Sequence, residues 1–118
     1  MSRVLLLVDD EPDITKVLRR MLKRSFDAVF TATSGEAAAE ILSQNSVTHV
    51  VADHDLGDEG PKGATLVSRW RQAHPSIRFA AIFTGRVSTR EIEGMPGINA
   101  AYAKPEADGL VQRLKEET

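Results

Sequence analysis

Five short apolar segments recur along the chain, and they constrain its fold more than any other feature. Each is three to five residues long, too short for a buried helix, and is therefore predicted to be a β-strand. Their apolar residues are consecutive rather than alternating, which indicates strands buried on both faces, as in a parallel sheet covered by helices. The predicted strands are residues 4–8, 28–32, 50–52, 79–83 and 100–103.

Helical patterns fill the intervals between these strands, and the clearest of them follows the first strand. Pro12 suits the first turn of this helix, because no amide hydrogen is needed there. The apolar positions then follow the spacing i, i+3, i+4, i+7 and i+8, which predicts a single stripe facing the core. These positions are Ile14, Val17, Leu18, Met21 and Leu22.

Four further helices are expected. Residues 33–36 have the spacing of a capping box and open the second helix. Pro75 stops the third helix, and the fourth, around residues 89–95, must be short because Gly94 and Pro96 interrupt it. The core positions of the second, third and fifth helices are Ala38, Ile41, Leu42, Leu66, Val67, Trp70, Leu110, Val111 and Leu114. Five strand–helix alternations predict right-handed crossovers and an open, doubly wound α/β sheet.

Composition limits the other possibilities. A chain of 118 residues allows one compact domain, residues 1–118, and 42% apolar residues argue against disorder. The net charge of −2 shows no general affinity for polyanions, so no direct nucleic-acid partner is expected. The absence of cysteine excludes disulfides, thiolate zinc sites and cysteine nucleophiles. No signal or transmembrane segment is visible, and we expect a cytoplasmic protein without a membrane partner.

Ligands bind to doubly wound sheets beyond the carboxyl ends of the strands. Three carboxylates converging at this edge would repel one another by about 4 kcal/mol per close pair at an effective dielectric of ~20, so a cation is expected among them. The chemically active residues that follow the strands are Asp9, Asp10, Glu11, Asp53, Asp55, Thr84 and Lys104.

Magnesium is the cation that this set fits best. It prefers one or two carboxylates, a carbonyl and several waters, and so suits Asp10, Asp53 and the backbone carbonyl of Asp55. Calcium is less favoured, because no loop has the ligand spacing of an EF-hand. Beside such a metal, the Asp53 carboxylate can attack a phosphorus centre and form an acyl phosphate. Lys104 and Thr84 can then hold other phosphoryl oxygens.

Four motifs carry a resemblance to a known family. They are residues 8–11 (VDDE), Asp53 at the end of the run 49–52, the pair 84–85 (TG) and the pair 104–105 (KP). In this order and at nearly these intervals, they resemble the receiver domain of two-component response regulators, of the chemotaxis-receiver type, over essentially the whole chain. The resemblance implies a flavodoxin-like (βα)5 fold with a parallel sheet in the strand order 2-1-3-4-5.

The resemblance also implies roles for individual residues. Asp53 is the expected phosphoacceptor, Asp10 a direct magnesium ligand and Asp9 a ligand through water. Lys104 is expected to contact the phosphoryl group, and Thr84 to move towards it. Tyr102 falls at the position of the aromatic residue that turns inward on activation, although a half-buried sheet aromatic is the alternative.

The implied partners are proteins of a phosphorelay. A histidine kinase or a histidine phosphotransfer protein would donate the phosphoryl group. A downstream partner protein or an effector domain beyond the chain would receive the signal. The expected state is a monomer or a weak phosphorylation-dependent dimer. The chain is not expected to be an enzyme, beyond catalysing its own aspartyl phosphorylation and dephosphorylation.

Two groups of residues have simpler interpretations. Acids before a helix are often only favourable to its dipole, which applies to Asp9 and Asp10. His54 neighbours Asp53, but a surface imidazole is the expectation. A run of basic residues on the first helix is either a solvated face or a surface that steers a partner. This run comprises Lys16, Arg19, Arg20, Lys23 and Arg24.

The chain departs from the family pattern in two places. The loop after Asp53 has Gly57 where members commonly carry proline, and it reaches the helix-opening Gly63 later, which predicts a longer, more flexible and more acidic loop. The short fourth helix puts the family's common dimerisation surface in doubt. A phosphorylation-independent interaction module is therefore an alternative. A second alternative is a haloacid-dehalogenase-like phosphatase, since residues 53–55 (DHD) resemble its nucleophile motif.

Overall fold

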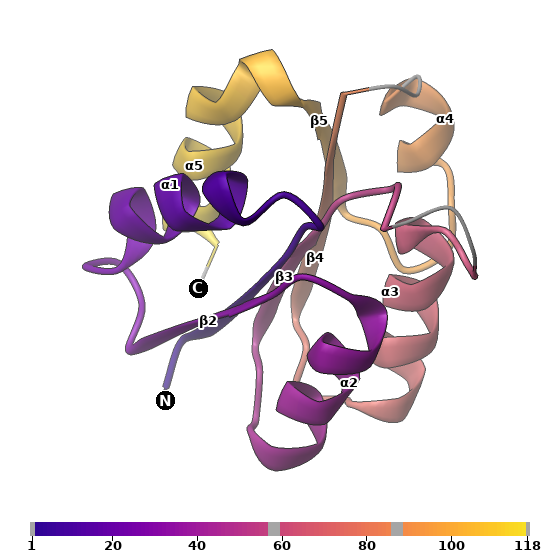
Figure 1. Cartoon of the computed structure of the whole chain (residues 1–118), viewed down its shortest axis with the longest axis horizontal. Helices are drawn as coiled ribbons and strands as arrows, with labels where there is room; N and C mark the ends of the chain where they lie inside the picture. Colours follow the sequence, from indigo (N-terminus) through magenta and orange to yellow (C-terminus); the bar gives the residue numbers. More distant parts are fainter. Residues whose placement is uncertain (1, 57–59, 86–88, 118) are drawn as a thin grey trace.

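A computed structural model describes residues 2–56, 60–85 and 89–117. It contains one parallel sheet with the strand order β2-β1-β3-β4-β5 (Figure 1). The strands are β1 (Val4–Val8), β2 (Ala28–Ala32), β3 (His49–Ala52), β4 (Phe79–Thr84) and β5 (Ala100–Ala103). The predicted fold class and strand order are thus confirmed; β3 begins one residue earlier and β4 ends one residue later than the sequence indicates.

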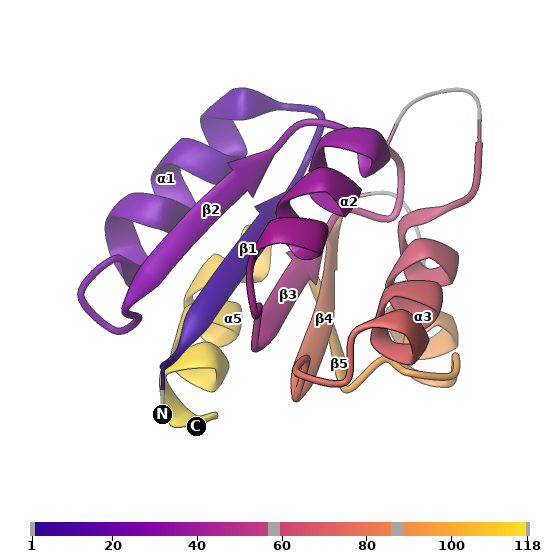
Figure 2. The ribbon, with the colours of Figure 1, turned by 90° about the horizontal axis from the view of Figure 1, so that it is seen from below.

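The helices follow the strands in strict alternation. They are α1 (Pro12–Leu22), α2 (Gly35–Gln44), α3 (Gly63–Ala73), α4 (Thr89–Glu93) and α5 (Ala107–Glu116), and a 3-10 turn, η1 (Lys104–Glu106), precedes α5. Helices α1 and α5 cover one face of the sheet, and α2, α3 and α4 cover the other (Figure 2). None of the described helices is long and apolar enough to cross a membrane.

Strand β1 shows why the strands are apolar at consecutive positions. Leu5 and Leu7 pack on the α1 and α5 side, whereas Leu6 and Val8 pack on the α2 and α3 side. Because successive side chains of a strand point to opposite faces, a strand with helices on both sides needs an apolar residue at every position. All four of these residues are buried.

Helix α1 corrects the predicted stripe. Val17 and Met21 are 53% and 38% exposed, whereas Leu18 and Leu22 are buried. Thr15 completes the buried line, since its hydroxyl donates a hydrogen bond to the carbonyl of Pro12 at 2.9 Å. The stripe is therefore narrower than the periodicity indicates, and it leaves two apolar side chains on the surface.

The start of α2 and the length of α4 test two further predictions from the sequence. Ser34 is the N-cap of α2, and its hydroxyl accepts a hydrogen bond from the Ala37 N–H at 3.1 Å. The cap is thus one residue beyond the start of the predicted capping box. Helix α4 has only five residues, of which Ile92 is buried, so the prediction of a short fourth helix is confirmed.

The amino edge of the sheet is closed around a buried histidine. The His49 side chain is fully buried, with Nδ1 2.7 Å from the Thr48 hydroxyl and Nε2 3.1 Å from the backbone carbonyl of Glu117. The ring of Phe26 packs edge-on against it at 5.0 Å. Arg3 donates to the same Glu117 carbonyl at 2.7 Å. These contacts fasten the end of α5 to the starts of β1 and β3.

Burial makes His49 sensitive to acid. Desolvation lowers its pKa below the ordinary value of 6.5, and the charges of Arg3 and Arg78 lower it further. The unfolded chain therefore binds a proton at a higher pH than the folded chain does. Below pH 6.5 the wild-type free energy of unfolding should fall relative to that of His49→Gln, with a slope approaching about 1.4 kcal/mol per pH unit. Urea unfolding of both proteins between neutral and mildly acidic pH measures this; parallel curves would contradict it.

Candidate functional site

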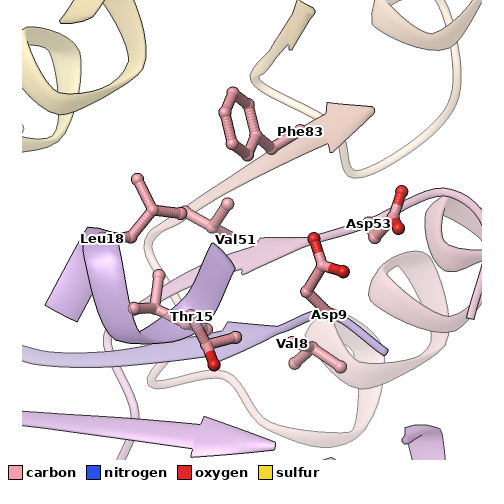
Figure 3. Close-up of a pocket in the computed structure, with 8 residues that line it drawn as sticks. Val8, Asp9, Thr15, Leu18, Val51, Asp53 and Phe83 are labelled. Carbon is pink, nitrogen blue, oxygen red and sulfur yellow. The ribbon is translucent and has the colours of Figure 1, made fainter. Parts of the chain in front are cut away.

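Parallel pairing brings the polar residues to one edge of the sheet. Val8 and Ala52 are partners in the register of β1 and β3, so the next residues, Asp9 and Asp53, leave the sheet side by side. The Asp53 N–H continues the ladder by donating to the Val8 carbonyl at 2.8 Å. Both carboxylates occupy the space above the strand ends (Figure 3). They are 3% and 6% exposed.

Lys104 supplies the positive charge at this edge. It follows β5, and its Nζ lies 3.1 Å from Asp9 Oδ2 and 3.3 Å from Asp53 Oδ2. The exposed carboxylate of Glu11 is farther away, at 3.9 Å. The lysine side chain is itself 21% exposed, so the ammonium group is only partly withdrawn from water. Glu11 is among the acidic residues expected at this edge, but its contact with Lys104 was not predicted.

Backbone amides hold the two buried carboxylates in place. The Glu11 N–H donates to Asp9 Oδ1 at 2.9 Å, and the Asp55 N–H lies 3.4 Å from Asp53 Oδ1. Each bond runs from residue i+2 back to the aspartate, a geometry in which the side chain closes its own turn. The Asp9 carboxylate therefore closes the turn that leads into α1, but it accepts from the residue before the helix rather than from the first amides of the helix.

An apolar floor beneath the carboxylates explains their electrostatics. Leu18, Val51 and Phe83 are among the residues that line a pocket of about 10 Å³ under the site, close to the volume that one water molecule needs (Figure 3). Desolvation by this surface raises the pKa of Asp9 to about 6. It also raises the pKa of Asp53, although Lys104 opposes the shift. Keeping the two buried carboxylates ionised therefore costs free energy, and a bound cation lowers this cost.

Three carboxylates are close enough to share a metal ion. One oxygen each from Asp9, Asp10 and Asp53 lie within 4.8 Å of one another. Asp10 is exposed, whereas the other two are buried, so the group opens to solvent on one side. Carboxylate oxygens are the donors that magnesium and calcium prefer, and an open side leaves room for water ligands. The donor set fits a hard divalent cation, and it does not distinguish between these two.

The two predicted switch residues lie on β4 and β5. Thr84 is the last residue of β4 and is buried. Tyr102 is half-buried, and its ring lies against α5, where a Cβ added to Gly109 would be 3.4 Å from the ring. The absence of a side chain at Gly109 thus gives the ring its place beside the helix. This arrangement is the packed sheet aromatic that was one of the two expectations for Tyr102.

The connection from β3 to α3 makes contacts that the sequence interpretation did not predict. Gly63 packs so closely on the strand end that an added Cβ would lie 1.9 Å from the Asp53 carbonyl oxygen. Its N–H donates to the His54 carbonyl at 2.8 Å. His54 is buried, so the expectation of a surface imidazole was wrong: this close approach of α3 covers it. Gly57, where the sequence departs from the proline that family members commonly carry, lies outside the described residues.

Comparison with known proteins agrees with this architecture. The family model described as "Response regulator receiver domain" matches residues 5–115. A two-component response regulator, PprB of Pseudomonas aeruginosa, is 31% identical over 107 residues, which cover 86% of this chain and 38% of that protein. The chain therefore spans well under half the length of this relative.

Solved structures show the same fold. A CheY-like receiver domain from Methanospirillum hungatei has a TM-score of 0.84 at 20% identity, with 99% of this chain and 94% of the other covered. A response regulator from Burkholderia pseudomallei, solved with a phosphorylated aspartic acid, calcium ion and citrate, has a TM-score of 0.80 at 22% identity, with 95% and 66% covered. The chain belongs to the family of response regulator receiver domains.

The close packing of Gly63 can be tested by substitution. In Gly63→Ala the new methyl group would overlap a backbone oxygen, so the loop must shift, and we expect a loss of more than about 2 kcal/mol in the free energy of unfolding. Gly94→Ala is the control, because its nearest atom, the Glu91 carbonyl oxygen, is 3.6 Å away. Urea unfolding measures both, and equal stabilities of the two variants would contradict the packing argument.

Proposed function

We propose that residues 1–118 act as one receiver domain that takes a phosphoryl group onto Asp53 from a histidine kinase or a histidine phosphotransfer protein. The observation that carries the proposal is the convergence of three carboxylates and the Lys104 ammonium at one sheet edge. Family membership supports the same role. The setting that we propose is the cytoplasm, and the domain catalyses no reaction other than its own phosphorylation and dephosphorylation.

The proposed reaction transfers a phosphoryl group from a histidine nitrogen of the donor to a carboxylate oxygen of Asp53. An oxygen of the ionised Asp53 carboxylate attacks the phosphorus of a phosphohistidine; the new P–O bond forms as the P–N bond breaks, and the imidazole nitrogen keeps the electron pair. The positive charge of Lys104 lowers the pKa of Asp53 against the effect of burial, and so favours the ionised nucleophile. Magnesium, held by Asp9, Asp10, Asp53 and the Asp55 carbonyl, would neutralise charge on the phosphoryl oxygens.

The proposed signal is a change of conformation at the ends of β4 and β5. The Thr84 hydroxyl is the group that would donate to a phosphoryl oxygen, and Tyr102 is the residue whose packing would follow. The ring of Tyr102 lies against Gly109 of α5. An inward turn of this ring, away from Gly109, would change the surface at the start of α5. A coupling of about 1–3 kcal/mol is typical of such two-state systems.

The proposed partners are proteins rather than nucleic acid or membrane. Val17 and Met21 are exposed on α1, on the same helix as Lys16, Arg19 and Arg20, and Lys23 and Arg24 follow its end. This apolar and basic surface suits a kinase or phosphotransfer protein. None of these cations forms a side-chain ion pair within the described residues. A downstream protein or an effector domain would read the switched state, and the domain itself would be a monomer or a weak phosphorylation-dependent dimer.

Phosphorylation by a small molecule tests the proposal directly. Incubation with magnesium and acetyl phosphate should add the mass of one phosphoryl group to the protein. The addition should be lost in Asp53→Asn and on chelation of magnesium, and strongly reduced in Asp10→Asn, which weakens the metal site. Intact-protein mass spectrometry measures it. Undiminished labelling of Asp53→Asn would refute the assignment of the phosphoacceptor.

The short α4 favours one alternative function. With five residues and a single buried side chain, this helix offers little surface for the dimers that receivers commonly form, as expected of a phosphorylation-independent interaction module. Magnesium and beryllofluoride, which mimic the phosphoryl group, should shift the NMR signals of Thr84, Tyr102 and α4 if the domain switches. Shifts confined to the carboxylates would instead favour the interaction module.

A further inference from the structure

A second lysine reaches the site from the start of α3. Lys62 Nζ lies 2.6 Å from Asp55 Oδ1, and the two side chains are 57% and 31% exposed. Asp55 follows the proposed phosphoacceptor by two residues, and its N–H is directed at Asp53 Oδ1. The ion pair therefore closes the connection between β3 and α3 beside the proposed nucleophile.

Helix stability does not explain a lysine at this position. Lys62 is the N-cap of α3 and makes no side-chain hydrogen bond to the helix. N-cap positions favour serine, threonine, aspartate or asparagine, whose oxygens accept from free amides. A cation also interacts unfavourably with the positive end of the helix dipole. The side chain that does engage the ammonium is the carboxylate of Asp55.

The backbone around Lys62 is well anchored. The next residue, Gly63, donates its N–H to the His54 carbonyl at 2.8 Å and packs against the Asp53 carbonyl. The backbone of Lys62 is thus held beside the end of β3, and its side chain reaches back to Asp55.

The charges of this edge are divided between two lysines. Lys104 lies between the buried carboxylates of Asp9 and Asp53. Lys62 pairs with Asp55, whose partly exposed carboxylate follows the proposed acceptor by two residues. A phosphodonor that approaches Asp53 brings further negative charge, and an uncompensated carboxylate close to its path would repel it.

We propose that Lys62 is a positioning residue for phosphoryl uptake: by holding and neutralising the Asp55 carboxylate, it admits the anionic phosphodonor to Asp53. This inference rests on the proposed function and adds a determinant of its rate. Lys62 acts through Asp55 and does not itself contact the phosphoryl group.

The rate of phosphorylation by acetyl phosphate tests this role. At low ionic strength and saturating magnesium, Lys62→Gln should be phosphorylated about fivefold more slowly than wild type, as expected when a positive charge beside the Asp55 carboxylate is removed. Lys62→Arg should restore most of the rate. Lys115 is exposed on α5 and forms no ion pair with any residue that the structure describes, so Lys115→Gln is the charge-matched control and should leave the rate unchanged.

Four further measurements separate positioning from a structural effect. In an Asp55→Asn background, the effect of Lys62→Gln should nearly vanish, because the charge that Lys62 neutralises is gone. High ionic strength should also shrink the effect. Phosphoramidate, which carries less negative charge than acetyl phosphate, should show a smaller difference. Unfolding midpoints should be nearly equal, since exposed ion pairs contribute under about 1 kcal/mol.

The outcomes distinguish this inference from the proposed function. If wild type is phosphorylated on Asp53 but Lys62→Gln matches its rate, or if the slowing persists unchanged in the Asp55→Asn background, the role of Lys62 is refuted and the receiver function stands. If wild type itself takes up no phosphoryl group with magnesium, both proposals fail.

Discussion

The ammonium of Lys104 lies 3.1 Å from Asp9 and 3.3 Å from Asp53, and the carboxyl edge of the sheet depends on this contact. Two carboxylates buried side by side over an apolar floor would otherwise face desolvation and mutual repulsion together. Burial alone lowers the pKa of Lys104, but its hydrogen bond to Asp9 and the charge of Asp53 outweigh this, so that its pKa is raised. The ion pair is thus less a source of stability than the condition under which a buried carboxylate can be held ionised.

The two edges of the sheet have different tasks. At the amino edge, His49, Arg3 and the end of α5 form a buried network of hydrogen bonds, with the imidazole fully enclosed. At the carboxyl edge, charge is concentrated, desolvated and partly open to water. A raised carboxyl pKa favours the folded state at low pH, whereas a lowered histidine pKa disfavours it there, so the two edges respond to acid with opposite signs.

Much of this arrangement could be predicted, for identifiable physical reasons. Consecutive apolar residues reveal strands covered on both faces, and parallel strands must bring Asp9, Asp53 and Lys104 to one edge. The exposure of Val17 could not be predicted, because helical periodicity gives the direction of a stripe but not its width, which depends on what packs beside it. The burial of His54 and the pairing of Lys62 with Asp55 both follow from how closely α3 approaches β3, a tertiary distance that no local pattern contains.

That close approach also explains how the connection between β3 and α3 could vary in length without moving Asp53. Gly63 packs against the Asp53 carbonyl and donates a hydrogen bond to the His54 carbonyl. These contacts hold the start of α3 at the end of β3, whatever the number of residues between them. The cost of closing a loop rises only slowly with its length. Residues can therefore be added between Asp55 and Lys62 without displacing the Asp53 carboxylate, provided that a glycine remains at the contact. Variation in this connection is then free to change the charge around the site while the geometry of the site is conserved.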